Sequence, residues 1–248
     1  MTNEKAIFDF NKDSKNYVVQ SNALINGRQS LKLNSAKLIR SAIMQVVAED
    51  TELKPYVIKI SELARLIEIS PSNMYRDIQE IIDDITENPV YVKEEANGIL
   101  KKYIKIPWVA RCEYEEGTGI IIKLNEELKP YLLNLKKHYT QYQLGEVLCM
   151  RSVYSIRIFE LIFSRIMNGS VPKRGCKVVI SIEELRACCD CIDKYPVFAN
   201  FRERVIETAV KEINQKTLYQ LEYNYIKKGK KVESIEFNII PFYNKDRF

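Results

Sequence analysis

The sequence predicts an α+β fold made of two tandem winged-helix domains, each with a helix-turn-helix and a β-hairpin wing. Three observations support this prediction. The order helix, strand, two close helices and strand-rich wing occurs twice along the chain. Capping residues mark helix starts in both copies, at Ser70 and Ser181. The length of 248 residues, 46% of them hydrophobic, is enough for a sizeable core and suits two domains better than one.

The first copy contains a helix-turn-helix signal around Ser70 and Pro71. Ser70 is expected to cap the second of two short helices, and Pro71 suits its first position because that position needs no backbone N–H donor. Small Ala64 lies in the preceding helix, where two backbones would approach each other. We expect helices over residues 34–48, 61–67 and 72–86, a short strand over 56–60, and wing strands over 89–94, 100–115 and 120–124.

The second copy repeats this order without close sequence identity to the first. Ser181 and Glu184 have the spacing of a capping box, in which each side chain bonds the backbone N–H of the other residue. We expect helices over residues 153–167 and 200–214, a short helix from 182 towards 191, a strand over 177–181, and wing strands over 219–226 and 232–240.

The boundary between the copies is predicted within residues 139–144. A helix over residues 125–137, with Pro130 near its first turn, closes the first copy. We therefore divide the chain into an N-terminal winged helix, residues 1–138, and a C-terminal winged helix, residues 139–248.

The positive charge of the chain is confined to its second part. Residues 1–144 hold 20 basic and 20 acidic residues, whereas residues 145–248 hold 18 basic and 13 acidic residues. The formal net charge of +5 therefore lies wholly in the second part, where lysines and arginines could neutralise phosphates and release condensed counterions. A solvated, mildly basic surface explains the charge equally well, so the motifs must decide.

The N-terminal residues 1–20 are polar and carry charges of both signs, so they contain neither an apolar export segment nor a membrane span. Six cysteines at irregular spacing do not form the framework of a secreted disulfide-rich protein. We expect a cytoplasmic protein with reduced thiols and no membrane partner.

The second helix-turn-helix offers arginines for DNA recognition. A helical wheel at about 100° per residue places Arg204 on the outward face, where it could offer a bidentate fork to guanine or hold a phosphate. Arg202 falls within the apolar arc, but its long stem could reach outward from the first turn. A surface ion pair with Glu203 or Glu207 is the alternative for either arginine. The DNA-binding candidates on this helix are Asn200, Arg202, Arg204 and Lys211.

The corresponding helix of the first copy presents polar residues mainly towards its N-terminus. Asn73 and Gln79 could read adenine, and Arg76 could read guanine or hold a phosphate. Asp83 and Asp84 follow further along, so only the N-terminal half suits DNA. Because the first part of the chain is net neutral, a merely solvated helix in a domain that serves dimerisation stays open. The candidates on this helix are Ser72, Asn73, Arg76 and Gln79.

The turn between the last two strands places four ammonium groups around Gly229, where they could contact a minor groove or the flanking phosphates. A charged tip is also a simple way to keep a turn soluble. These wing candidates are Lys227, Lys228, Lys230 and Lys231. Together with the helices, they assign the main DNA contact to residues 139–248, and auxiliary DNA contact and dimerisation to residues 1–138.

The sequence argues against an enzyme. His138 is the only histidine, so one chain cannot hold the paired-histidine metal site of a DNA-nicking replication protein. The phosphate-binding motif G-x-x-x-x-G-K-[ST] is absent. The cysteines at 188, 189 and 191, with Cys176 nearby in sequence, lack paired C-x-x-C spacing, so we expect buried thiols in place of a zinc site. We expect no cofactor and no metal.

Six short segments carry a family resemblance: residues 22–25, 155–161, 201–205, 209–214, 226–231 and 235–237. They resemble the plasmid replication initiator (Rep) proteins with tandem winged helices, over residues 17–242 and most strongly in the second copy. The resemblance implies that monomers bind repeated origin sites (iterons) in double-stranded DNA. It also implies dimerisation through the first domain, repression of the protein's own promoter by dimers at an inverted repeat, and recruitment of host replication initiator and helicase proteins.

A transcriptional regulator with the same fold is the alternative, because a fold does not fix a function. The resemblance of the linked second domain and the lack of a recognisable ligand-sensing domain favour an initiator. A binding site made of several direct repeats beside an AT-rich tract would indicate an initiator, and a single inverted repeat over a promoter would indicate a regulator.

Overall fold

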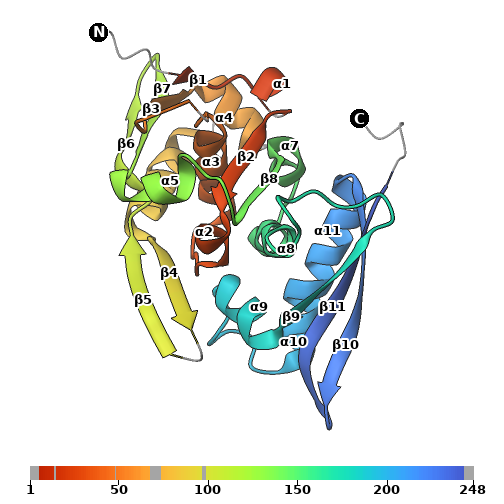
Figure 1. Cartoon of the computed structure of the whole chain (residues 1–248). Helices are drawn as coiled ribbons and strands as arrows, with labels where there is room; N and C mark the ends of the chain where they lie inside the picture. Colours follow the sequence, from red (N-terminus) through yellow and green to blue (C-terminus); the bar gives the residue numbers. More distant parts are fainter. Residues whose placement is uncertain (1–5, 14, 48, 68–73, 97–98, 243–248) are drawn as a thin grey trace.

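The computed structural model describes residues 6–13, 15–47, 49–67, 74–96 and 99–242. Within these ranges it confirms the predicted α+β fold of two winged-helix units (Figure 1). None of the helices in these ranges is both long and apolar enough to cross a membrane.

The first unit follows the predicted order of elements. Its helix-turn-helix consists of α4 and α5, and the turn between them lies outside the described residues. In chain order, the elements are β1 (Ala6–Ile7), α1 (Phe10–Asp13), β2 (Tyr17–Ser21), α2 (Asn22–Asn26), α3 (Leu33–Met44), β3 (Pro55–Ile58), α4 (Ile60–Ile67), α5 (Met74–Glu87), β4 (Val90–Ala96), β5 (Ile99–Ile106), β6 (Val109–Glu115) and β7 (Gly119–Leu124).

The second unit again places a helix, a strand, two helices and a hairpin in sequence. Four short connecting elements precede it, namely η2 (Glu126–Leu128), α6 (Lys129–Leu132), β8 (Tyr139–Gln143) and α7 (Leu144–Leu148). The unit itself contains α8 (Val153–Phe163), β9 (Cys176–Ser181), α9 (Ile182–Cys188), α10 (Phe198–Phe201), η3 (Arg202–Glu207), α11 (Thr208–Lys216), β10 (Tyr219–Lys228) and β11 (Lys231–Pro241). Strand β8 pairs with β2 near the start of the chain, and the predicted division between residues 138 and 139 stays a prediction.

Three helices end earlier than the periodicity predicts. The helix expected over residues 125–137 shortens to a 3-10 turn and the four-residue α6, and Asn134 and His138 beyond it have φ values of 54°. The helix expected to reach residue 167 ends at Phe163, and Asn168 has a φ of 52°. Left-handed backbone cannot continue a right-handed helix, so these residues turn the chain. The helix expected to reach residue 48 ends at Met44.

The two units share one sheet topology. In each unit, the strand before the helix-turn-helix pairs antiparallel with the last strand of the wing. That last strand also pairs with the first strand of the wing. The sheets therefore read β1-β3-β7-β6 and β9-β11-β10. Hairpin β6–β7 is thus the counterpart of hairpin β10–β11, and β4–β5 is an additional two-stranded hairpin. Pro107 divides the run expected over residues 100–115 into β5 and β6, because proline cannot donate a ladder hydrogen bond.

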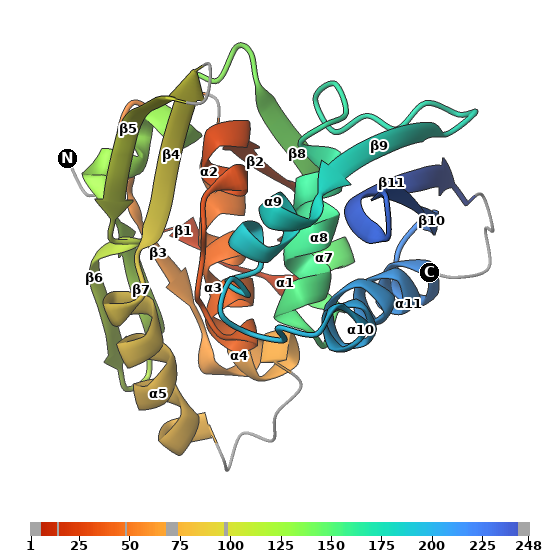
Figure 2. The same ribbon diagram turned by 90° about the horizontal axis from the view of Figure 1, so that it is seen from below.

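Helices α2, α3 and α8 lie between the strands of the first unit and the sheet of the second unit (Figures 1 and 2). Helix α8 is apolar on nearly all sides, and its Ile156, Phe159 and Ile162 are fully buried. Such all-round burial explains why the sequence of this helix is almost continuously hydrophobic. The two units therefore share a continuous core.

A buried network of charged side chains lies at the centre of this shared core. Arg157 and Glu160 on α8 and Arg40 on α3 are each at most 1% exposed. Arg40 donates hydrogen bonds to both carboxylate oxygens of Glu160, at 3.0 and 2.8 Å, and Arg157 Nη1 donates a third at 2.7 Å. Burial alone would raise the pKa of Glu160, but the charges of Arg40 and Arg157 outweigh it and lower that pKa to about 2.

Arg157 connects the two units through its remaining donors. Its Nη2 donates to the carbonyl oxygens of Ile25 and Gly27, at 2.5 and 2.8 Å, at the end of α2. Its Nε donates to the carbonyl oxygen of Cys188 in α9, at 3.3 Å. One guanidinium thus satisfies backbone acceptors from both units, and this fixes the orientation of one unit relative to the other.

Candidate nucleic-acid interface

The second helix of the second helix-turn-helix, called the second recognition helix below, is one continuous rod formed by α10, η3 and α11. A regular helical wheel predicts an apolar stripe of six residues, and the structure buries all of them except Val210, which is partly exposed. The residues that this stripe buries are Phe201, Val205, Ile206, Ala209 and Ile213, each at most 1% exposed. The stripe packs on α8, which leaves the opposite side of the rod free for DNA.

Four predicted DNA contacts lie along this rod. Asn200, Arg204 and Lys211 are exposed, as the wheel predicts. The guanidinium of Arg204 lies 5.8 Å from the ring centroid of Tyr195, and among the described residues it forms no ion pair with Glu203 or Glu207. A cationic group resting on an aromatic face stays accessible to a nucleic acid.

Arg202 departs from the wheel. Residues 202–207 form a π-helical turn, in which backbone bonds join residues five apart. This turn brings Arg202 out of the apolar arc, so that its side chain is 40% exposed and its Nε lies 3.1 Å from Oε1 of Glu207. Arg202 therefore forms the predicted ion pair with Glu207, and its partly exposed side chain stays a candidate for DNA contact. A helical wheel with about 100° per residue could not predict the position of Arg202, because it does not describe a π-helical turn.

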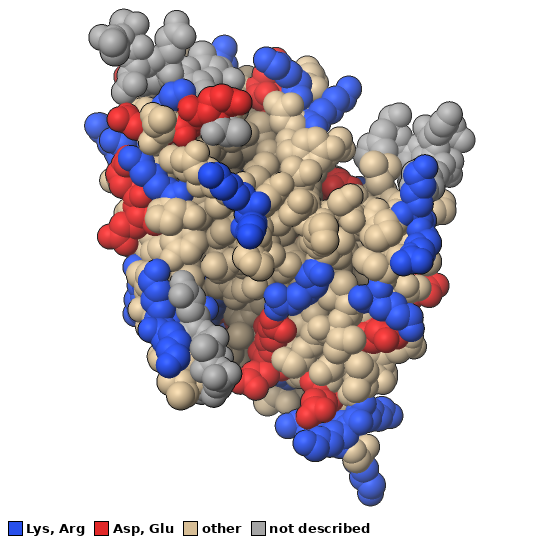
Figure 3. Space-filling view, viewed as in Figure 1, with Lys and Arg blue, Asp and Glu red and all other residues tan. Residues whose placement is uncertain are grey.

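The tip of hairpin β10–β11 is basic and exposed. The chain turns at Gly229, whose φ of +62° suits glycine. Nζ of Lys228 lies 3.9 Å from Oε1 of Glu233, and an exposed ion pair of this length contributes little to stability. The space-filling view shows the blue cluster at the lower right (Figure 3). The four predicted lysines, all exposed, are Lys227, Lys228, Lys230 and Lys231.

The corresponding hairpin of the first unit is acidic at its tip. Glu115 and Glu116 are exposed beside Gly117, where the second unit has its lysines. Acidic side chains repel phosphates, so the counterpart wing cannot supply the same contact. The basic residues of the first unit gather elsewhere, along the additional hairpin, where Lys101, Lys102 and Lys105 are exposed (Figure 3).

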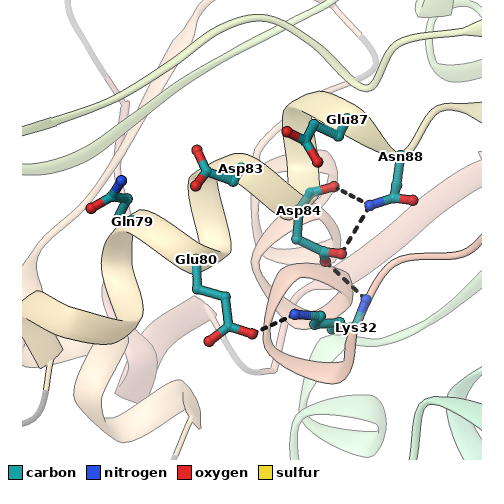
Figure 4. A pocket seen from close by; sticks show the side chains of 7 residues that line it. All are labelled: Lys32, Gln79, Glu80, Asp83, Asp84, Glu87 and Asn88. Carbon is teal, nitrogen blue, oxygen red and sulfur yellow. Dashed lines mark hydrogen bonds and ion pairs between the residues drawn. The ribbon is translucent and has the colours of Figure 1, made fainter.

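Helix α5 is acidic beyond its N-terminal part. Gln79 is exposed, as predicted, whereas Ser72, Asn73 and the side chain of Arg76 lie outside the described residues. Lys32 pairs with Glu80, and its backbone N–H donates to Asp84 at 2.9 Å (Figure 4). These groups line a shallow pocket with Gln79, Asp83, Glu87 and Asn88. This acidic face disfavours contact with phosphates beyond the first turns of α5.

Sequence reasoning missed a polar cluster beside the second recognition helix. Tyr223 on β10 donates a hydrogen bond to Glu207 at 3.2 Å, and the hydroxyl groups of Tyr223 and Tyr225 lie 3.5 Å apart. The alternation along β10 indicates only that these tyrosines share a face. The π-helical turn that brings Glu207 to them has no local sequence signal.

The cysteines of α9 and the following turn pack in the core. Cys188, Cys189 and Cys191 are buried, and burial raises the pKa of each thiol. The sulfur of Cys188 accepts a hydrogen bond from Arg157 at 3.0 Å. In the part of the chain that the structure describes, no three His, Cys, Asp or Glu side chains form a group that could hold a metal ion.

Two family models match the chain, and the first of them extends from the first unit through helix α8. The model described as "Initiator Replication protein, WH1" matches residues 17–163, more than half of the chain. The model described as "Initiator Rep protein, WH2" matches residues 181–239, which include both helices and the hairpin of the second unit.

Full-length similarities agree with these matches. A PI protein of Escherichia coli is 24% identical over an alignment of 270 positions, gaps included, which covers 95% of this chain and 86% of that protein. A replication initiation protein of Escherichia coli is 22% identical over 226 residues, which cover 90% of this chain and 69% of that protein. The solved structure of the Pi initiator protein in complex with iteron DNA matches the fold with a TM-score of 0.74 at 20% identity, over 93% of this chain and 99% of that chain.

Proposed function

The chain belongs to the family of initiator replication proteins, and on that basis we propose that it starts plasmid replication by binding repeated sites in double-stranded origin DNA. The observation that carries the proposal is the second unit: an exposed Arg204 on a complete recognition helix, beside a hairpin tip with four exposed lysines. A recognition helix reads the major groove, and a basic wing holds the neighbouring phosphates.

The second unit supplies most of the DNA affinity in this proposal. Its wing tip carries lysines where the first wing carries Glu115 and Glu116, and α5 is acidic beyond its first turns. Contacts with phosphates provide a large share of the affinity of a DNA-binding protein. The first unit adds auxiliary contacts through the N-terminal part of α5, which includes the candidate Arg76 and Gln79.

Both recognition helices can face one duplex. Seen from below, α5 and the rod of α10 and α11 lie along one side of the molecule, and the end of hairpin β4–β5 lies on the opposite side (Figure 2). The buried Arg157 network holds the units in this relation. A fixed relation means that the two helices read a site with fixed spacing, which suits an array of identical repeats.

The opposite side suits self-association through the first unit. On hairpin β4–β5, Ile99, Leu100 and Tyr103 are each more than half exposed. Within the described residues β5 pairs only with β4, so one of its edges is open to pairing. We infer that dimers form through this hairpin and repress the promoter at an inverted repeat, while monomers bind the origin. Sedimentation should show a concentration-dependent mixture that origin DNA shifts towards monomer, and one unchanging species would contradict this inference.

The remaining parts of the proposal follow from the role at an origin. The chain acts by binding and not by catalysis, in the cytoplasm where plasmids replicate, and it recruits host replication initiator and helicase proteins to the bound repeats. Pure protein incubated with metal ions and supercoiled origin DNA should leave that DNA intact. Nicked product would show that the chain is an enzyme.

A footprint on the DNA of the source plasmid tests the proposal. Full-length protein should protect several direct repeats beside an AT-rich tract. Protection of a single inverted repeat over a promoter, with no repeats, would identify a transcriptional regulator and contradict the proposal.

A further inference from the structure

The second recognition helix contains a local irregularity at the point where it would enter DNA. The π-helical turn η3 replaces ordinary α-helix over Arg202–Glu207, and the hydroxyl of Thr208 donates to the carbonyl oxygen of Glu203, five residues earlier. Such turns are rare and are frequent at functional sites. In a regular α-helix, side chains five residues apart diverge by about 140° around the axis. The contact of Arg202 with Glu207 therefore depends on this turn.

Glu207 holds two partners at once. Its Oε1 lies 3.1 Å from Nε of Arg202 and accepts the hydrogen bond of Tyr223 at 3.2 Å. Tyr223 lies on β10, the first strand of the basic wing. A hydrogen bond with Tyr225 on the same strand is the main reason that the pKa of Arg202 is raised, followed by the charge of Glu207. One carboxylate thus joins the recognition helix to the root of the wing.

Each side chain of the pair is partly exposed, although Nε of Arg202 itself is buried. The side chains of Arg202 and Glu207 are 40% and 44% exposed. Because Nε of Arg202 faces Glu207 and is buried, any contact with a guanine falls to the terminal amino groups of the guanidinium. The carboxylate of Glu207 also repels phosphates that come close to it, so a duplex that gives Arg202 no base contact has nothing to offset this repulsion.

We propose that Glu207 is a positioning residue for DNA recognition, which aims Arg202 at a guanine and disfavours duplexes that leave Arg202 without a base. This inference rests on the proposed function and adds the device that sets sequence preference in the second unit. Exposed ion pairs contribute little to folding. The loss of Glu207 should therefore change binding and leave the thermal transition of the chain unchanged.

Affinity measurements with two duplexes test this role. The probes are a duplex selected from a random-sequence pool by the full-length chain and a shuffled duplex of the same composition. Glu207→Ala should reduce the ratio of the two affinities about tenfold, the effect of one lost base contact. Glu207→Gln keeps the acceptor oxygen and should keep most of the ratio. The matched control Glu203→Ala removes an equal charge from the same turn and should strengthen binding of both duplexes equally.

A double variant shows whether Glu207 acts through Arg202. Combining Arg202→Ala with Glu207→Ala should reduce the ratio no further than Arg202→Ala alone, because a positioning residue has no role without its partner. A wild-type chain that binds both duplexes equally would overturn the proposed function together with this inference. Two other results would overturn the inference alone, provided that the wild-type chain prefers the selected duplex. One is an unchanged affinity ratio in Glu207→Ala, and the other is a double variant in which the two single losses add.

Discussion

Glu160→Gln should be among the most destabilising single substitutions in this chain. Glu160 is the counter-charge of two guanidiniums, those of Arg40 and Arg157, and all three side chains are buried. Glutamine keeps the size of the side chain and removes the charge. Two buried cations would then lie close together with no anion between them, at the place where the units meet.

The loss of stability in Glu160→Gln can be estimated in two ways. The pKa of Glu160 falls from 4.5 to about 2, and each unit corresponds to about 1.4 kcal/mol, so ionisation stabilises the fold by about 3 kcal/mol. Breaking a buried ion pair by removing one partner costs about 3–5 kcal/mol. Because the folded pKa is depressed, the stabilisation is present above about pH 4.5 and is lost as the pH falls through about 2.

Urea unfolding of the full chain at about pH 7 measures this effect. The matched control is Glu236→Gln, which removes the partner of exposed Lys177 and should cost no more than about 1 kcal/mol. A loss for Glu160→Gln that does not exceed the loss for Glu236→Gln would refute the reasoning that the network holds the units together.

Three further predictions concern other sites. Burial raises the pKa of Glu146 to about 7, so the contribution of this carboxyl to stability falls as the pH rises from about 4.5 to 7. In urea unfolding, Glu146→Gln should therefore gain about 2.5 kcal/mol relative to wild type between about pH 5 and pH 8, and an equal difference at both pH values would contradict this. Arg204→Ala should weaken binding to a selected duplex more than Arg76→Ala does, and equal losses on selected and shuffled duplexes would show that Arg204 holds only the backbone. Lys230→Ala should reduce the slope of log affinity against log salt by about one, and an unchanged slope would exclude a phosphate contact.

Local sequence signals predicted the elements that depend on neighbouring residues. Ser181 caps α9 as predicted, since its Oγ accepts the N–H of Glu184 at 3.1 Å. The reciprocal half of the capping box does not form, because the side chain of Glu184 pairs with Arg165. The apolar stripe of the second recognition helix, from Phe201 to Ile213, is buried as periodicity requires. In both cases the interaction lies within one or a few turns, where sequence spacing determines geometry.

The features that escaped prediction depend on distant segments. Hairpin β4–β5 can be separated from the true wing β6–β7 only once the pairing of β3 with β7 is known. The contact of Glu207 with Tyr223 requires both the π-helical turn and the register of β10. The residues around Arg157 resembled a family motif, but the role of Arg157 depends on carbonyl groups about 130 residues earlier in the chain. Spacing along a sequence does not report such long-range pairs.

Dependence of plasmid replication on this chain tests the central claim most directly. A test plasmid would carry the footprinted repeats and a selectable marker but no copy of this gene. It should replicate in cells that supply the full-length chain and fail in cells that supply none. Replication at the same copy number without the chain, or failure in the presence of a chain that binds the repeats, would show that it does not initiate replication.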